Sequence, residues 1–158
     1  SRRAGRLDEA LAAVEEAFEA IEAQADEEES ATSRLHALYE RARVHVARGD
    51  ERAAREDLLA LVAAQGIADA YPSVGAYRYL AMIEPRLADG DGARWLELAC
   101  EQAESLRPGP LRQVAAAAAG EVLWRGAPPP HLAARLEAVW RAVMGEGAGE
   151  AALDALVY

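Results

Sequence analysis

The residue types that most often carry catalysis are few in this chain, and their spacing keeps them apart. His36 and His45 stand nine positions apart, on nearly opposite faces of a helix, so they cannot share a metal ion. Three glutamates lie within four positions of the lone cysteine, Cys100, and nearby carboxylates raise a thiol pKa, whereas a nucleophile needs a lowered one. No zinc-binding His-Glu-x-x-His motif and no glycine-rich phosphate loop occurs. We therefore expect no enzymatic activity, no metal and no cofactor.

A second group of side chains is suited to binding. His36, Tyr39, Arg43 and Ala47 stand three or four positions apart, so they share one helix face. A histidine, a tyrosine and an arginine on one face can hold a carboxylate or an extended peptide. An ordinary mixed surface is the alternative interpretation.

Further candidates for the same groove come from two later helices. They are Tyr77, Arg78 and Glu84, and then Gln113, Ala116, Gly120 and Trp124. The three tryptophans, Trp95, Trp124 and Trp140, also lie on helical stripes, which indicates core positions. The alanine run 115–119, followed by Gly120, predicts a close-packed helix face.

The composition predicts helices throughout. Alanine is the commonest residue, and Ala, Leu, Glu and Arg all favour helix. The net charge of −10, with no lysine, argues against nucleic acid and against an anionic membrane surface as partners. One cysteine permits no internal disulfide, and no signal peptide or membrane-spanning run is present, so we expect a cytoplasmic protein.

Glycine and proline divide the chain into about eight helical stretches with short connections. A stripe at i, i+3, i+4 and i+7 is clearest in the first, and Pro85 should kink or end the fourth. Gly49 suits the left-handed residue that closes a helix, and Asp50 suits the cap of the next one. The predicted helices span about 7–28, 32–48, 51–65, 73–88, 93–106, 111–125, 130–144 and 149–157.

A short phrase occurs twice, as Gly-Arg-Leu-Asp-Glu-Ala at 5–10 and Gly-Asp-Glu-Arg-Ala-Ala at 49–54. Both copies place a small residue five positions after a glycine turn. Ala42 before the second copy and Leu58 after it add the small and large residues expected where two helices cross closely. This pattern resembles the tetratricopeptide (TPR) repeat, and 103–108 resembles the end of such a repeat.

The resemblance implies an all-α solenoid of stacked antiparallel helix pairs in a single domain, 1–158. The expected units are 1–29 (second helix of a pair only), 30–66, 73–107 and 110–145, with a terminal helix at 149–157. The glycine turns expected at 5, 49, 90 and 126 lie 36 to 44 residues apart, longer than the usual spacing of about 34. That spacing is similar to kinesin-light-chain-like repeats, and the arginine-only basic residues suggest a bacterial, high-GC source.

The resemblance also implies a function. TPR stacks commonly bind ligands on the concave face lined by the first helix of each pair, so we expect a protein- or peptide-binding scaffold. The partner would be a protein, a peptide or another domain of the same parent chain. The first helix lacks its preceding partner helix, which predicts a fragment of a larger protein and would permit self-association through that helix.

Two alternatives stay open. One is a regulatory or sensor region that controls a kinase, protease or transcription regulator in a longer signalling protein. The other is a small helical enzyme or small-molecule binder with a deep pocket lined by Trp124, Trp140 and the alanine run.

Overall fold

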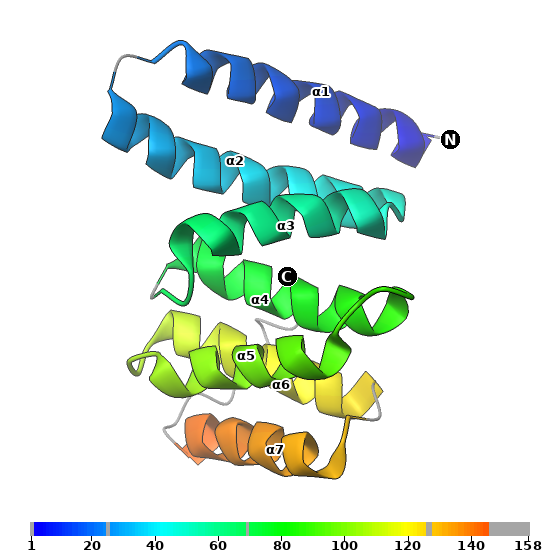
Figure 1. The fold of residues 1–158 in the computed structure, drawn as a ribbon, viewed down its shortest axis with the longest axis vertical. Helices are drawn as coiled ribbons and strands as arrows, with labels where there is room; N and C mark the ends of the chain where they lie inside the picture. The colour runs from blue at the N-terminus through cyan, green and yellow to red at the C-terminus, as the bar shows by residue number, and fades with distance from the viewer. Residues whose placement is uncertain (1, 25, 69, 126–127, 146–158) are drawn as a thin grey trace. The chain divides into compact units, whose positions relative to one another are not determined.

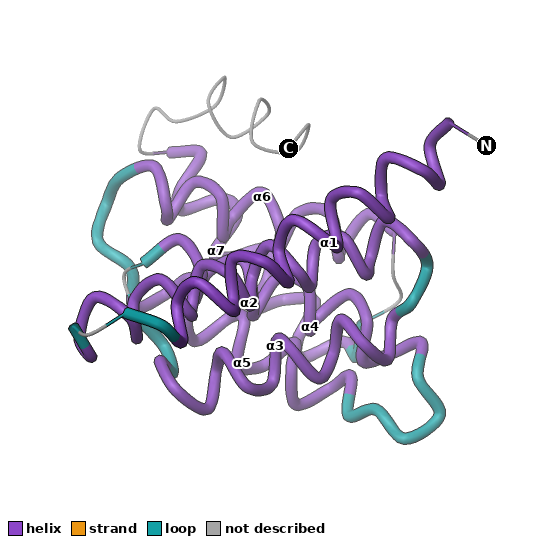
Figure 2. The backbone as a smooth tube through the Cα atoms, turned by 90° about the horizontal axis from the view of Figure 1, so that it is seen from above, coloured by secondary structure: helices purple, strands orange, loops and turns teal. Residues whose placement is uncertain are grey.

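The computed structural model describes residues 2–24, 26–68, 70–125 and 128–145. Within those residues the chain forms seven α-helices and one 3₁₀ helix and contains no β-strand (Figure 1). The loops are short and lie at the helix ends (Figure 2). The all-α prediction is therefore confirmed for this part of the chain, and none of its helices is long and apolar enough to cross a bilayer. The predicted last helix, 149–157, lies outside the described residues.

The chain divides into two compact units, Ser1–Gly66 and Ile67–Tyr158. The boundary falls in the connection between the second and third predicted repeat units. Unit 1 contains α1 (Arg2–Glu22), α2 (Glu27–Arg48) and α3 (Glu51–Gln65). Unit 2 contains α4 (Tyr71–Ile83), η1 (Glu84–Arg86), α5 (Gly92–Ser105), α6 (Pro110–Arg125) and α7 (Pro130–Gly145).

The turn between α2 and α3 forms as the sequence predicts. Gly49 has a φ of 81°, and the backbone N–H groups of Gly49 and Asp50 donate to the carbonyls of Val46 and His45. The carboxylate of Asp50 then accepts a hydrogen bond of 3.1 Å from the N–H of Ala53 and caps α3. These two residues reverse the chain within one turn, so α2 and α3 pack as an antiparallel pair.

The crossing of α2 and α3 also follows the predicted pattern. Ala42 and Ala54 are both 0% exposed, and Leu58 and Leu61 are fully buried beside them. Two methyl side chains at the crossing let the helix backbones approach closely, and the leucines fill the space next to it. α1 also packs on α2, so α2 lies between α1 and α3 as the central helix of unit 1.

The boundaries of α1 and α2 differ from the prediction. Gly5, expected in a turn, lies inside α1, and α1 ends at Glu22 instead of near 28. α2 begins at Glu27 instead of near 32, because the Asp26 carboxylate accepts hydrogen bonds from the N–H groups of Glu28 and Glu29 at 3.0 and 3.1 Å. The first copy of the repeated phrase therefore marks no turn, and only the copy at Gly49 does.

Unit 2 consists of two helix pairs. α4 packs on α5, α6 packs on α7, and α6 also contacts both helices of the preceding pair. A shared apolar core of Val74, Leu106, Ala116, Val139 and Val143 joins the pairs. Each pair is antiparallel because its connection is short.

The end of α4 confirms the prediction for Pro85 and adds a feature that the sequence did not suggest. α4 stops at Ile83, and Pro85 lies in the 3₁₀ turn η1 instead of in a helix continuing to 88. Glu84 is 0% exposed, and its carboxylate accepts a hydrogen bond of 2.7 Å from the N–H of Asp91. A Cβ atom on Gly90 would lie 2.0 Å from the Glu84 carbonyl oxygen, so this loop can close only over a glycine.

Candidate functional site

The predicted binding line on α2 is only partly accessible. His36 is exposed and Arg43 half-buried, whereas Tyr39 is 4% exposed and therefore belongs to the interior. Arg43 donates to the Glu40 carboxylate at 3.2 Å, and its guanidinium carbon lies 5.9 Å from the centre of the Tyr39 ring. The accessible face of α2 thus consists of His36, Glu40, Arg43 and Ala47, with the buried Tyr39 ring supporting Arg43.

A groove opens at one end of unit 1, between the start of α1 and the end of α2. It encloses about 450 Å³ and is wide open to solvent. We call it the cationic groove; it is lined by Arg3, Ala4, Leu7, Asp8, Ala47 and Arg48. Arg48 and Asp8 form an ion pair of 3.3 Å across it. Its volume lies within the range of about 300–1,000 Å³ that is usual for ligand sites, and Ala47 joins it to the accessible face of α2.

An arginine that sequence analysis did not single out ties the three helices of unit 1 together. Arg41 on α2 donates from Nε and Nη2 to both carboxylate oxygens of Asp57 on α3, at 2.8 and 2.6 Å. The same guanidinium lies over the Phe18 ring of α1, 4.4 Å from its centre. The hydrogen bond to Asp57 is the main cause that raises the pKa of Arg41. Arg41 thus contacts both neighbours of α2, the helix that carries the predicted binding line.

The predicted residues on α4 are mostly engaged within unit 2. Tyr77 is buried and packs against Trp95, with ring centres 5.9 Å apart, and burial raises the Tyr77 pKa. Arg78 forms an ion pair of 3.2 Å with Glu121 on α6, and both side chains are only 14% exposed. Glu84, which lies in η1 directly after α4, is fully buried. This part of the predicted groove is therefore a set of internal contacts between helices.

The predicted residues on α6 divide by exposure. Gln113 is half-buried, Ala116 is buried, and Gly120 lies against Trp140, where an added Cβ would meet the ring at 3.0 Å. Trp124 is 89% exposed, so the prediction that it belongs to the core was wrong. A helical stripe places a residue on a face but does not say whether another helix covers that face.

The alanine run 115–119 is buried, in agreement with the predicted close-packed face. The cavity beside it, which Arg78 and Gln102 also line, has a volume of about 20 Å³. That is space for about one water molecule. This cavity is thus too small for the ligand that the small-molecule alternative requires.

Cys100 is 1% exposed in the interior of unit 2. Burial raises its pKa to about 11, and Glu104 and Glu97 add to the shift while Arg135 opposes it. The neutral thiol is therefore stable at physiological pH and unsuited to nucleophilic attack. Among the described residues, no three His, Cys, Asp or Glu side chains are placed to hold a metal ion.

Comparison of the chain with protein-family models, with curated proteins and with solved structures found no match.

Proposed function

We propose that this chain is a protein- or peptide-binding scaffold built from helix pairs of the TPR type. The α2–α3 pair carries the proposal. Its left-handed Gly49, the capping Asp50 and the fully buried Ala42 and Ala54 agree with the turn and the close crossing that the resemblance implies. The packing of α6 on both α4 and α5 adds support, because stacked repeats place each new pair against both helices of the previous one.

The binding surface that we propose is the accessible face of α2 together with the cationic groove. In this arrangement α2 is the first helix of its pair, the helix that lines the ligand face in TPR stacks. Arg43 is paired with an exposed Glu40, so a ligand carboxylate can replace that partner at little cost. Arg3 and Arg48 would hold further acidic groups at the end of the same surface. The ligand class is thus an extended or helical segment with acidic side chains.

Peptide selection tests this proposal without a known ligand. A random peptide library displayed on phage is selected on the full chain, and the affinity of the enriched peptides is measured by fluorescence anisotropy. The double variant Arg43→Glu/Arg48→Glu should weaken binding at least about tenfold, because it replaces attraction by repulsion at two contacts.

The matched control is Arg86→Glu/Arg94→Glu, which makes the same charge change at exposed residues of unit 2. It should leave the affinity within about twofold. Failure to enrich any saturable binder, or equal losses in the two double variants, would contradict the proposed surface.

A further inference from the structure

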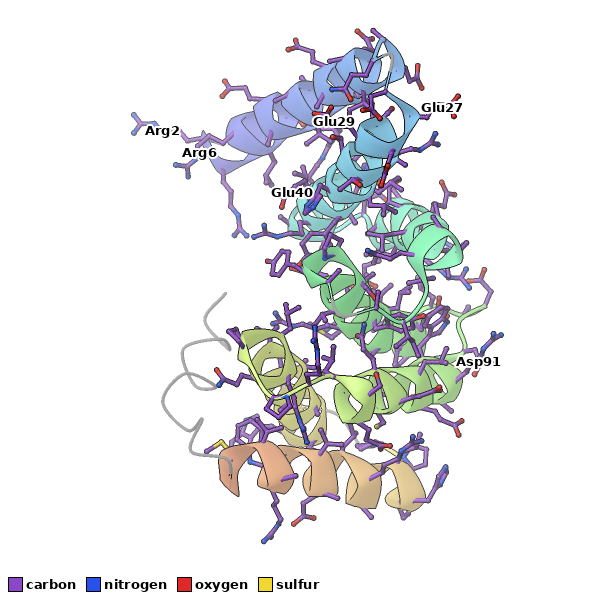
Figure 3. All side chains as sticks on the ribbon, turned by 90° about the vertical axis from the view of Figure 1, so that its left-hand side faces the viewer. Arg2, Arg6, Glu27, Glu29, Glu40 and Asp91 are labelled. Carbon is purple, nitrogen blue, oxygen red and sulfur yellow. The ribbon has the colours of Figure 1, made fainter. Side chains whose placement is uncertain are left out.

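Unit 2 encloses polar side chains between its helices. Ser73 on α4 and Gln102 on α5 are both fully buried. Side chains fill the space between these helices in Figure 3, where the labelled Asp91 caps the start of α5. Burying a polar atom costs free energy unless the atom has a hydrogen-bond partner. Each enclosed polar atom therefore needs a partner inside the unit.

The amide of Gln102 finds one such partner on α4. Its Nε2 donates to Ser73 Oγ at 2.9 Å, and the same oxygen accepts from the backbone N–H of Ala68 at 3.1 Å. The other end of the amide is Oε1, an acceptor with two lone pairs. Since Ser73 engages Nε2, the Oε1 atom can take a further donor.

The guanidinium of Arg78 on α4 carries a donor that needs an acceptor. Its Nη2 donates to Glu121 Oε2 on α6 at 3.2 Å. Its Nε is buried and has no hydrogen-bond partner in the part of the chain that the structure describes. A missing hydrogen bond is more costly for a charged group than for a neutral one. An acceptor close to Arg78 would therefore stabilise the folded unit.

The small cavity beside the alanine run lies against both groups. Of the described residues that line it, only Arg78 and Gln102 have polar side chains. Its volume of about 20 Å³ exceeds the roughly 10–15 Å³ that one water molecule requires. A buried water also needs at least two polar partners, and these two side chains supply one donor and one acceptor. The cavity thus has the size and the polar groups that a bound water requires.

We propose that this cavity holds one ordered water molecule, which accepts a hydrogen bond from the Arg78 guanidinium and donates one to Gln102 Oε1. The water completes a chain of hydrogen bonds that links α6 to α4 through Glu121 and Arg78 and continues to Gln102 on α5. A polar network in which every member has a partner favours one arrangement of the packed helices. The site lies within unit 2, so it is independent of the binding surface that we propose for unit 1.

Magnetic relaxation dispersion of water ¹⁷O tests this proposal, because it detects waters that stay in a protein longer than the protein takes to rotate. The ¹⁷O signal does not follow the exchange of labile side-chain protons. The wild-type chain should show such a dispersion. The variant Ala118→Ser places a hydroxyl group at the wall of the cavity and should displace the water. Its dispersion should be smaller than that of the wild type by about one water.

The matched control is Ala117→Ser, which makes the same change at the neighbouring position. Ala117 is buried but is not among the residues that line the cavity, so this variant should keep the wild-type dispersion. Circular dichroism checks that both variants keep their helices. A wild-type chain without dispersion, or equal losses in the two variants, would overturn the proposal.

A high-resolution crystal structure of the wild-type chain gives a second measurement that needs no variant. We expect a water oxygen within about 3.2 Å of both Gln102 Oε1 and the Arg78 guanidinium. In Gln102→Leu, which removes the acceptor, that position should hold no water. Well-defined density for both side chains with no water between them, or a water that persists in Gln102→Leu, would contradict the proposed site.

Discussion

The contact of Arg41 with Asp57 allows a quantitative prediction, because the two side chains differ in burial. Asp57 is 8% exposed at its side chain and Arg41 is 28% exposed. In Arg41→Ala the Asp57 carboxylate stays buried and loses both hydrogen bonds from the guanidinium, and the nearest basic side chain left is the imidazole of His45, with Nε2 3.9 Å away. Breaking a fully buried pair costs about 3–5 kcal/mol. The partial exposure of Arg41 reduces this to about 2–3 kcal/mol, and loss of its contact with Phe18 adds about 0.5–1 kcal/mol.

The reverse substitution should cost less. In Asp57→Ala the Arg41 guanidinium can turn toward solvent, so we expect a loss of about 1–2 kcal/mol. The double variant should then be no less stable than Arg41→Ala alone, because it removes the unpaired buried carboxylate. Arg41→Met keeps most of the apolar stem over Phe18 and separates the packing from the charge.

Urea unfolding followed by far-ultraviolet circular dichroism measures these free energies. All three tryptophans lie in unit 2, so tryptophan fluorescence follows that unit separately. Additive losses for the two single variants, within about 0.5 kcal/mol, would refute the reasoning. Equal losses for Arg41→Ala and Asp57→Ala would refute the argument from their different burial.

Two further predictions concern glycine and the buried thiol. Gly5→Ala should raise the free energy of unfolding by about 0.5–1 kcal/mol, since Gly5 is helical with open space around it. Gly120→Ala should lower it by about 1 kcal/mol, because the added methyl group would press against the Trp140 ring. Equal effects of the two substitutions in urea unfolding would contradict this prediction. The pKa of the Cys100 thiol is about 9 in the unfolded chain and about 11 in the folded one. The neutral thiol therefore contributes fully to the free energy of unfolding below pH 9, and this contribution is lost as the pH rises through 11. The loss of about 2–3 kcal/mol should be absent in Cys100→Ala, and identical pH profiles would contradict the assignment.

The sequence predicted those parts of the fold that depend on neighbouring residues. Gly49 and Asp50 define a turn by themselves, because a left-handed glycine and a capping carboxylate are local features. Ala42 and Ala54 were placed at the crossing by their fixed distances from that turn. The same phrase failed at Gly5, since glycine is tolerated inside a helix and Arg6 follows it where the second copy has the capping Asp50.

The start of α2 was predicted too late, although its signal is visible. Asp26 is followed by three glutamates, and a capping carboxylate before an acidic first turn is typical of a helix start. The prediction treated the acidic run as the end of the preceding helix. The predicted end of the first helix, near 28, was therefore also too late, because α1 ends at Glu22.

The candidate site depended on contacts that sequence spacing does not reveal. Tyr39 shares a face with His36 and Arg43, but spacing could not show that its ring is buried. Arg41 and Asp57 lie 16 positions apart on different helices, so their pairing depends on the register of α2 against α3. The exposure of Trp124 likewise depends on where α7 lies against α6. Burial and pairing of this kind can be predicted only when the packing of the helices is known, and composition and periodicity do not determine that packing.

The most direct test of the binding scaffold is a titration of the ¹⁵N-labelled chain with a selected peptide, followed by two-dimensional NMR. We expect saturable shift changes at the backbone amides of the proposed binding surface, which are those of His36, Glu40, Arg43, Ala47 and Arg48. We expect much smaller changes for the backbone amides of α7. Shifts that do not saturate, or that are confined to unit 2, would contradict the proposed binding surface.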